Sequence, residues 1–516
     1  MKKINRTKAV AKNIYFSFIT QAVIVFINFL SRTVFIKQLG NNYLGINGLF
    51  YNILTLLSLS ELGFGNAIIY SLYKPIANND EKKISAIMNF YGKVYKYIFL
   101  IISIIGLSIV PFLKYIINMD EASNFPLNEI KIYYLLFLIN SLSSYLYAYK
   151  SNLIVANQKA YIVKKYNLVT IIIQFIVQMV ILLLFKNYAA YLIVQIICTF
   201  GNNILIAKKT EKMYPFITNV EEIGENEKNS ICKNVKSIFI YKIATTFVEN
   251  IDNILISIMV GTAVVGYYSN YHMIVNGVLG VITMFFTSFT ASVGNLNVEK
   301  EELKKEKVFD DIIFLNSFIM SAAATAFIIC FEPFINWWIG NEYVLNKYVT
   351  LIIILNFYIY GILNPVCVFR DTTGKFKESR NIAIILMFLN LILSIFLGKI
   401  WGLFGILFAT AISKLFTNVW YQPYILYRDV FKSNVFKYYY RQLKNVLIIA
   451  ISSFISWMII KNINCNNLIS LIIKALISIS VTTLIFGFLN YKEDSLKNLI
   501  ERFKFIIMGR NKYDNG

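Results

Sequence analysis

Charged residues are scarce in this chain. Asp, Glu, Lys and Arg make up 15% of its 516 residues, whereas hydrophobic residues make up 57%. A soluble domain averages about 25% charged residues. The composition therefore excludes a soluble multidomain protein and predicts an integral membrane protein.

Residues that bind metals are also rare. His272 is the one histidine, and the five cysteines form no CxxC pair. A His/Cys metal site is therefore not expected, and the cysteines are interpreted as small hydrophobic residues in helices. We expect no cofactor, although coupling to a proton or sodium gradient stays open.

The net charge of +22 resembles a nucleic-acid signal, but no separate domain supplies the basic grooves and stacking platforms that such binding needs. Cytoplasmic loops of membrane proteins collect Lys and Arg. The charge therefore indicates membrane topology, and no nucleic-acid partner is expected.

Apolar segments of roughly 18–25 residues recur along the whole chain, about fourteen in number. They predict an all-α integral membrane protein with about 14 transmembrane helices. The first segment is too long for a signal peptide and lacks a small-residue cleavage site, so we expect it to be retained. The segments lie near 13–36, 45–73, 95–117, 132–149, 167–185, 188–207, 237–260, 273–293, 311–331, 348–368, 381–398, 402–425, 445–461 and 468–489.

The distribution of basic residues gives the orientation. With the N-terminus inside, 39 of the 50 Lys and Arg fall in inner segments and 7 in outer loops. Because cytoplasmic loops carry the excess of basic residues, both termini should be cytoplasmic in a multi-pass protein of the bacterial cell membrane.

A short motif occurs twice. Gly40 and Gly45 follow the first apolar segment, and Gly261 and Gly266 follow the seventh, 221 residues later. Two similar six-helix halves are common in secondary transporters. The predicted organisation is an N-lobe at 1–207, a cytoplasmic linker loop at 208–236, a C-lobe at 237–427, two further helices within 428–490 and a cytoplasmic tail at 491–516.

Ionisable side chains interrupt the apolar segments. A charge at mid-membrane costs at least about 2.5–3.5 kcal/mol on insertion scales, so it usually has a function. The pattern predicts a polar path or cavity, and hence transport. The residues are Arg32, Glu61, Lys242, Glu249, Asp252, Lys414 and Lys474.

Three of these residues share one helical face. At about 100° per residue, Glu249 and Asp252 lie roughly 20° and 80° from Lys242. Such a face must avoid lipid, so it lines a wet cavity or forms an ion-pair set that locks the bundle.

The predicted depths suggest two layers of opposite charge. Arg32 and Asp252 lie in the outer third of the membrane, whereas Glu61 lies below the middle and Lys242 near the inner third. We hypothesise that the two opposite charges of each layer form an ion pair when the protein is closed on that side of the membrane. Arg32 could instead snorkel to the interface, as Lys474 is expected to do, whereas Lys414 is a candidate cavity cation.

Several motifs resemble the Wzx-type polysaccharide flippases of the multidrug/oligosaccharidyl-lipid/polysaccharide (MOP) exporter superfamily. The resemblance runs from about residue 10 to 430. It rests on Leu39-Gly-Asn-Asn-Tyr-Leu-Gly45-Ile-Asn-Gly-Leu, Leu57-Ser-Leu-Ser-Glu61-Leu-Gly-Phe-Gly65, Asp252-Asn-Ile-Leu-Ile-Ser, Gly266-Tyr-Tyr-Ser-Asn-Tyr and Trp401-Gly-Leu-Phe-Gly405.

The resemblance implies a V-shaped, MATE-like bundle of two six-helix lobes that works by alternating access. The implied cargo is an undecaprenyl-diphosphate-linked oligosaccharide for capsule, O-antigen or other surface polysaccharide, and the implied partners are this lipid-linked glycan, membrane lipids and other polysaccharide-assembly proteins. Arg32, Lys242 and Lys414 would contact the diphosphate. Glu61, Glu249 and Asp252 would serve ion coupling or gating.

Two alternatives remain. A drug or metabolite exporter of the same superfamily would have a more apolar or acidic cavity. An enzyme that uses the same lipid carrier would need a large outer loop or paired carboxylates outside the membrane, and neither is found. Asp310 and Asp311 are adjacent but stand at a predicted helix start, where they are interpreted as complementing the helix dipole. We therefore do not expect an enzyme.

Overall fold

The computed structural model describes residues 6–58, 64–118, 126–219, 221–290, 293–294, 296, 302–374, 376–463, 467–498 and 501. Glu61 and Cys465 lie outside these ranges, as does the tail at 499–516 apart from residue 501. The described residues form helices and turns without strands, which confirms the predicted helical class.

Nine helical stretches in the described ranges are long and apolar enough to cross a membrane. The chain is thus a multi-pass membrane protein, whereas the count of about 14 spans and the two-lobe arrangement stay predictions.

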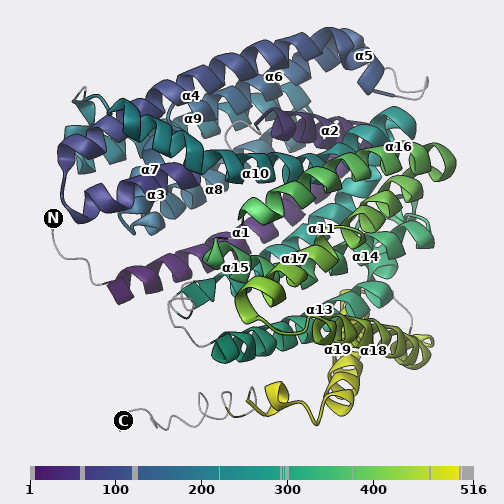
Figure 1. Cartoon of the computed structure of the whole chain (residues 1–516). Helices are drawn as coiled ribbons and strands as arrows, with labels where there is room; N and C mark the ends of the chain where they lie inside the picture. Colours follow the sequence, from purple (N-terminus) through teal and green to yellow (C-terminus); the bar gives the residue numbers. More distant parts are fainter. Residues whose placement is uncertain are drawn as a thin grey trace. The chain divides into compact units, whose positions relative to one another are not determined.

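The helices divide into two compact units, each with its own packing. The first unit holds residues 1–270 and 387–406. Its helices are α1 (Arg6–Leu39), α2 (Asn41–Leu57), α3 (Phe64–Ala77), α4 (Glu81–Ile109), α5 (Leu113–Ile116), α6 (Leu127–Tyr145), α7 (Ala148–Ala156), α8 (Ala160–Leu184), α9 (Tyr188–Met213) and α10 (Glu225–Met259), with the start of α11 (Thr262–Thr287). The long helices α1 and α8 pack together, as do α6 and α9 (Figure 1).

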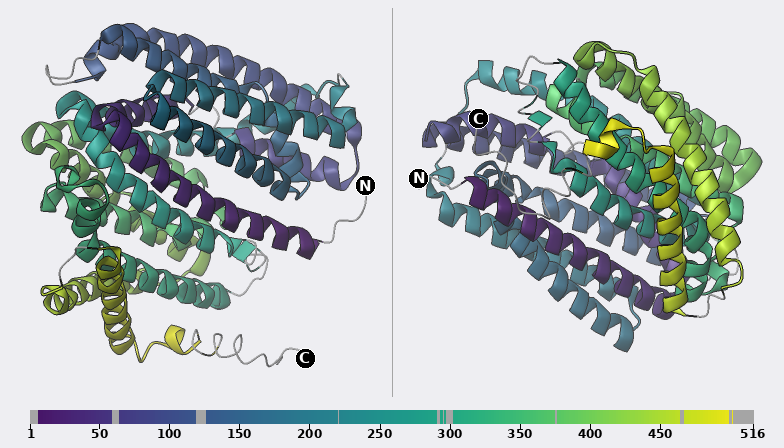
Figure 2. Two further views of the ribbon diagram at one scale, coloured as in Figure 1. Left: turned by 180° about the vertical axis from the view of Figure 1, so that it is seen from behind. Right: turned by 90° about the horizontal axis from the view of Figure 1, so that it is seen from below.

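The second unit holds residues 271–386 and 407–516. It contains the rest of α11, α13 (Glu302–Ile339), α14 (Lys347–Ile362), α15 (Asn364–Thr373), both ends of α16 (Phe376–Leu415), α17 (Asn418–Leu426), α18 (Phe436–Ile460) and α19 (Leu468–Leu489). The C-terminal helices α18 and α19 pack on each other and on α13 (Figure 2). The backbone of Gly402, with φ of 56°, kinks α16.

The stretch 208–236, which the sequence predicts as a linker loop, is helical at both ends, because α9 continues to Met213 and α10 begins at Glu225. The segment between them is held against α4, where Ser85 Oγ and Asn89 Nδ2 donate to the Asn219 carbonyl at 2.6 and 2.7 Å. The lobe boundaries predicted around this segment stay a prediction.

Candidate functional site

The two copies of the glycine motif meet in the first unit. A Cβ on Gly45 would overlap the carbonyl oxygen of Thr262, and one on Gly266 would overlap Asn41. Gly45 therefore lets α2 approach Thr262, the residue after Gly261. In the same way, Gly266 lets α11 approach Asn41, the residue after Gly40. Asn41 Nδ2 also donates to the Ala263 carbonyl at 2.8 Å.

A third segment closes on this contact. The Thr262 N–H donates to the Asn118 carbonyl at 2.7 Å, and the Asn118 N–H donates to Thr262 Oγ1 at 3.0 Å. Ser257 Oγ donates to the Ile116 carbonyl at 2.8 Å. We call the contact between Asn41, Gly45, Thr262 and Gly266 the glycine junction. It joins the α1–α2 and α10–α11 turns.

Arg32 lies on α1 beside the glycine junction. Its Nη1 donates to Ser269 Oγ on α11 at 2.9 Å. Ser269 Oγ in turn donates to the Gly266 carbonyl at 2.8 Å, so its lone pairs remain to accept from the guanidinium. Tyr191 on α9 is close enough to interact electrostatically with Arg32. Arg32 is thus held against a neighbouring helix, and its role as a cation of the site stays a prediction.

Asp252 lies in the neighbourhood of Tyr268, the residue before Ser269. Its side chain is buried in α10, with 8% of the residue exposed, and it is close enough to Tyr268 for an electrostatic interaction. Arg32 and Asp252 therefore both lie near the same turn of α11. The proposed charge layer of these two residues stays a prediction.

The other predicted site residues differ in exposure. Glu249 is exposed on α10, whereas Lys242 is half-buried. In the second unit, half-buried Lys414 lies over the Tyr360 ring at 5.7 Å from its centroid. Glu61 falls outside the described residues, so its role stays a prediction.

Sequence reasoning missed Ser269, although the residue stands inside the quoted motif Gly266-Tyr-Tyr-Ser-Asn-Tyr. The sequence feature that could have identified it is the spacing of three residues between Gly266 and Ser269, which places the two residues on one helical face. The partner on α1 could not be read from the sequence, because the contact spans 237 residues.

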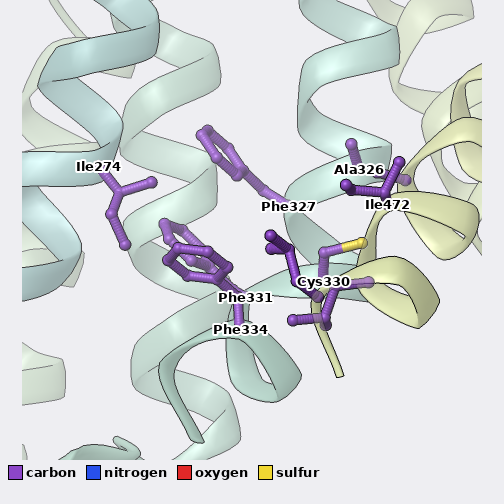
Figure 3. Close-up of a pocket in the computed structure, with 10 residues that line it drawn as sticks. Ile274, Ala326, Phe327, Cys330, Phe331, Phe334 and Ile472 are labelled. Atoms are coloured by element: carbon purple, nitrogen blue, oxygen red, sulfur yellow. The ribbon is translucent and has the colours of Figure 1, made fainter. Parts of the chain in front are cut away.

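The second unit holds an apolar cavity of about 270 Å³. Phe327, Phe331 and Phe334 of α13 line it together with residues of α19 (Figure 3). Its walls are hydrocarbon apart from the sulfur of Cys330, so it suits an alkyl or isoprenoid chain better than a charged group. The remaining lining residues are Ile274, Ala326, Leu468, Leu471, Ile472 and Ala475.

A cluster of charges also joins the helices of the second unit. Arg441 of α18 pairs with Asp310 of α13 at 3.2 Å and with Glu493 at 3.3 Å. Lys444 pairs with Glu493 at 3.3 Å, and Lys437 pairs with Asp310 at 2.6 Å. The helix-dipole interpretation of Asp310 is therefore wrong, because α13 begins at Glu302 and Asp310 lies inside it.

Two lysines of the first unit have partners near the ends of α7 and α9. Lys150 pairs with Glu211, and Lys159 donates from Nζ to the Tyr214 hydroxyl at 3.5 Å. Burial lowers the pKa of Lys159, and burial raises the pKa of Tyr214 to about 12. These contacts give both lysines structural partners.

No known family profile matches the chain, and no curated protein matches it by sequence. Solved structures do match. A structure of the lipid II flippase MurJ in an inward closed conformation aligns with 93% of this chain and 99% of its own, at 15% identity and a TM-score of 0.70.

Multidrug transporters also match. A mutant of the MATE transporter VcmN from Vibrio cholerae aligns with 83% of this chain and 99% of its own, at 13% identity and a TM-score of 0.59. An inward-facing MATE transporter of the MOP superfamily aligns with 77% of this chain and 94% of its own, at 13% identity and a TM-score of 0.60.

The chain therefore has the fold that MOP-superfamily transporters and flippases share. At these identities the comparison defines the fold and leaves the cargo open.

Proposed function

We propose that this protein is a flippase that moves undecaprenyl-diphosphate-linked oligosaccharide from the inner to the outer leaflet by alternating access, for cell-surface polysaccharide. The apolar cavity between α13 and α19 is the observation that carries the proposal. A polyprenyl tail is a long hydrocarbon that needs such a surface, whereas a small water-soluble drug does not.

The structural comparison supports this cargo class. The MurJ match leaves 7% of the chain unaligned, which is fewer residues than α18 (25 residues) and α19 (22 residues) contain together. The likeness to this flippase thus extends into the pair of helices α18 and α19, of which α19 borders the cavity. The two MATE matches cover smaller shares of the chain.

The cations supply the second part of the argument. A diphosphate headgroup is an anion that pairs with guanidinium and ammonium groups. Arg32, Lys242 and Lys414 are the proposed contacts, and Arg32 is the one that can bind phosphate through two parallel hydrogen bonds. Glu61, Glu249 and Asp252 are proposed to serve ion coupling or gating. In the proposed orientation both termini face the cytoplasm.

A deletion strain tests this function. Without the chain, lipid-linked oligosaccharide should accumulate on the inner leaflet, and wild type should restore export, whereas Arg32→Ala, Asp252→Asn and Glu61→Gln should fail although they reach the membrane. Unchanged surface glycan together with increased drug sensitivity would replace this proposal with the MATE-like exporter.

A further inference from the structure

Helix α11 has two sides of opposite character. The Asn276 side chain is exposed, and other polar side chains in the part of the helix that belongs to the second unit lie on the same side. At 100° per residue, their positions lie within about 40° of Asn276. They are His272, Thr283 and Thr287. We call this set, together with Asn276, the α11 polar face.

The opposite side is apolar. Ile274, Val281 and Phe285 lie about 140–180° from Asn276, and Val281 and Phe285 are 44% and 40% exposed. Ile274 lines the apolar cavity (Figure 3). This side therefore suits lipid or an isoprenoid tail. Lipid cannot solvate an exposed amide, so the α11 polar face must border water.

The side chains of the polar face are organised. Asn276 Nδ2 lies 3.0 Å from His272 Nδ1, and with the amide donating, the ring is neutral and carries its proton on Nε2. Thr283 Oγ1 donates to Asn364 Oδ1 at 3.3 Å. The His272–Asn276 pair thus combines an imidazole donor with an amide oxygen acceptor, the two functions needed to bind a sugar hydroxyl.

The lack of charged residues in α11 indicates which part of the cargo this helix could bind. Residues 262–287 contain no Asp, Glu, Lys or Arg. A helix face without cations does not select a diphosphate, whereas neutral donors and acceptors recognise hydroxylated groups by hydrogen bonds.

We propose that the α11 polar face contacts the oligosaccharide of the cargo, and that His272 and Asn276 determine which sugars are accepted. This proposal rests on the flippase function. It assigns the glycan to α11, the diphosphate to Arg32 and its fellow cations, and the lipid tail to the apolar cavity.

Binding to the purified full-length protein tests the assignment with two probes. One is undecaprenyl diphosphate without sugar, and the other is undecaprenyl diphosphate that carries the oligosaccharide, extracted from the host. In His272→Phe and Asn276→Leu, the affinity for the glycosylated probe should fall about tenfold, because hydrogen bonds are lost, while the affinity for the sugar-free probe should not change. Val281→Leu, on the opposite face and outside the cavity lining, is the matched control.

The outcomes separate the two proposals. If the variants lose affinity equally for both probes, or lose none for the glycosylated probe, the proposed role of α11 is overturned. Wild type that binds both probes equally also overturns it and leaves the flippase function standing. Wild type that binds neither probe refutes the flippase function itself.

A second measurement needs no cargo. In a variant without the five native cysteines, Asn276→Cys should react with a membrane-impermeant maleimide, whereas Val281→Cys should not. Comparable low reactivity at both positions would overturn the proposal, because the polar face would then be sealed from water.

Discussion

At the residue scale, the central feature is how Arg32 is held. The sequence predicted the residue as a candidate cation but left snorkelling open, because only the apolar context was visible. The hydrogen bond to Ser269 Oγ fixes the guanidinium against α11. A fixed guanidinium presents its remaining N–H groups in a set direction, which is what bidentate recognition of a phosphate needs.

Removing the Ser269 hydroxyl should weaken that recognition. A hydrogen bond to a charged group contributes about 1.5–3 kcal/mol, so Ser269→Ala should reduce the affinity for undecaprenyl diphosphate by about tenfold or more, and Ser269→Thr should retain it. Titration of the purified variants measures the effect. Ser288→Ala, at an exposed serine that bonds the end of α11, is the control, and an unchanged affinity in Ser269→Ala would contradict the positioning role.

At the element scale, the glycine junction joins two helix turns that stand 221 residues apart in the chain. The repeat itself was readable from the sequence, because Gly40 and Gly261 both precede a re-entering helix. Both glycines do have positive φ, of 86° and 140°. The contact of one copy with the other was not readable, since the sequence does not show which turns approach each other in the folded chain.

An added methyl group should open the glycine junction. In Gly45→Ala or Gly266→Ala the new Cβ collides with backbone or with Asn41, so the turns must separate, and overpacking of this kind typically costs about 1–3 kcal/mol. Maleimide labelling of Asn41→Cys, in the cysteine-free background, should increase in either variant.

Two other glycines serve as controls for that experiment. Gly201 has no neighbour within 4 Å, and a Cβ on Gly48 would make an ordinary contact with Val265 at 3.4 Å. Gly201→Ala and Gly48→Ala should leave labelling unchanged. Labelling that rises equally in all four variants would mean that helix stability, and not the close approach, controls access.

The charge cluster around α13 and α18 makes a separate prediction about stability. The side chains of Arg441 and Asp310 are only 10% and 12% exposed, so Arg441→Met removes the buried partner of the Asp310 carboxylate and leaves it the exposed Lys437. Such a loss typically costs about 3–5 kcal/mol. Denaturation of the purified protein should show it.

Lys437→Ala is the matched variant, because the Lys437 side chain is 59% exposed although it pairs with the same carboxylate. An exposed pair contributes about 1 kcal/mol or less. Equal destabilisation by both substitutions would argue that exposure does not set the strength of these pairs.

At the scale of the whole molecule, the sequence was informative about the helical class and not about how the helices pack. Recurring apolar segments predicted that class, because membrane insertion depends on local hydropathy, whereas the number and bounds of the spans stay predictions. The division into compact units was not predictable, since it depends on which helices touch. The same is true of the pair of Arg441 and Asp310, because the sequence does not distinguish these two charges from the other charged residues around them.

The cargo is the central claim, and reconstitution tests it most directly. The protein is placed in liposomes with undecaprenyl-diphosphate-linked oligosaccharide in the membrane, and a glycan-binding lectin outside reports how much glycan crosses from the inner leaflet. The account predicts transfer with wild type and little transfer with Arg32→Ala. Transfer at the same rate in protein-free liposomes, or no transfer with correctly folded wild type, would contradict it.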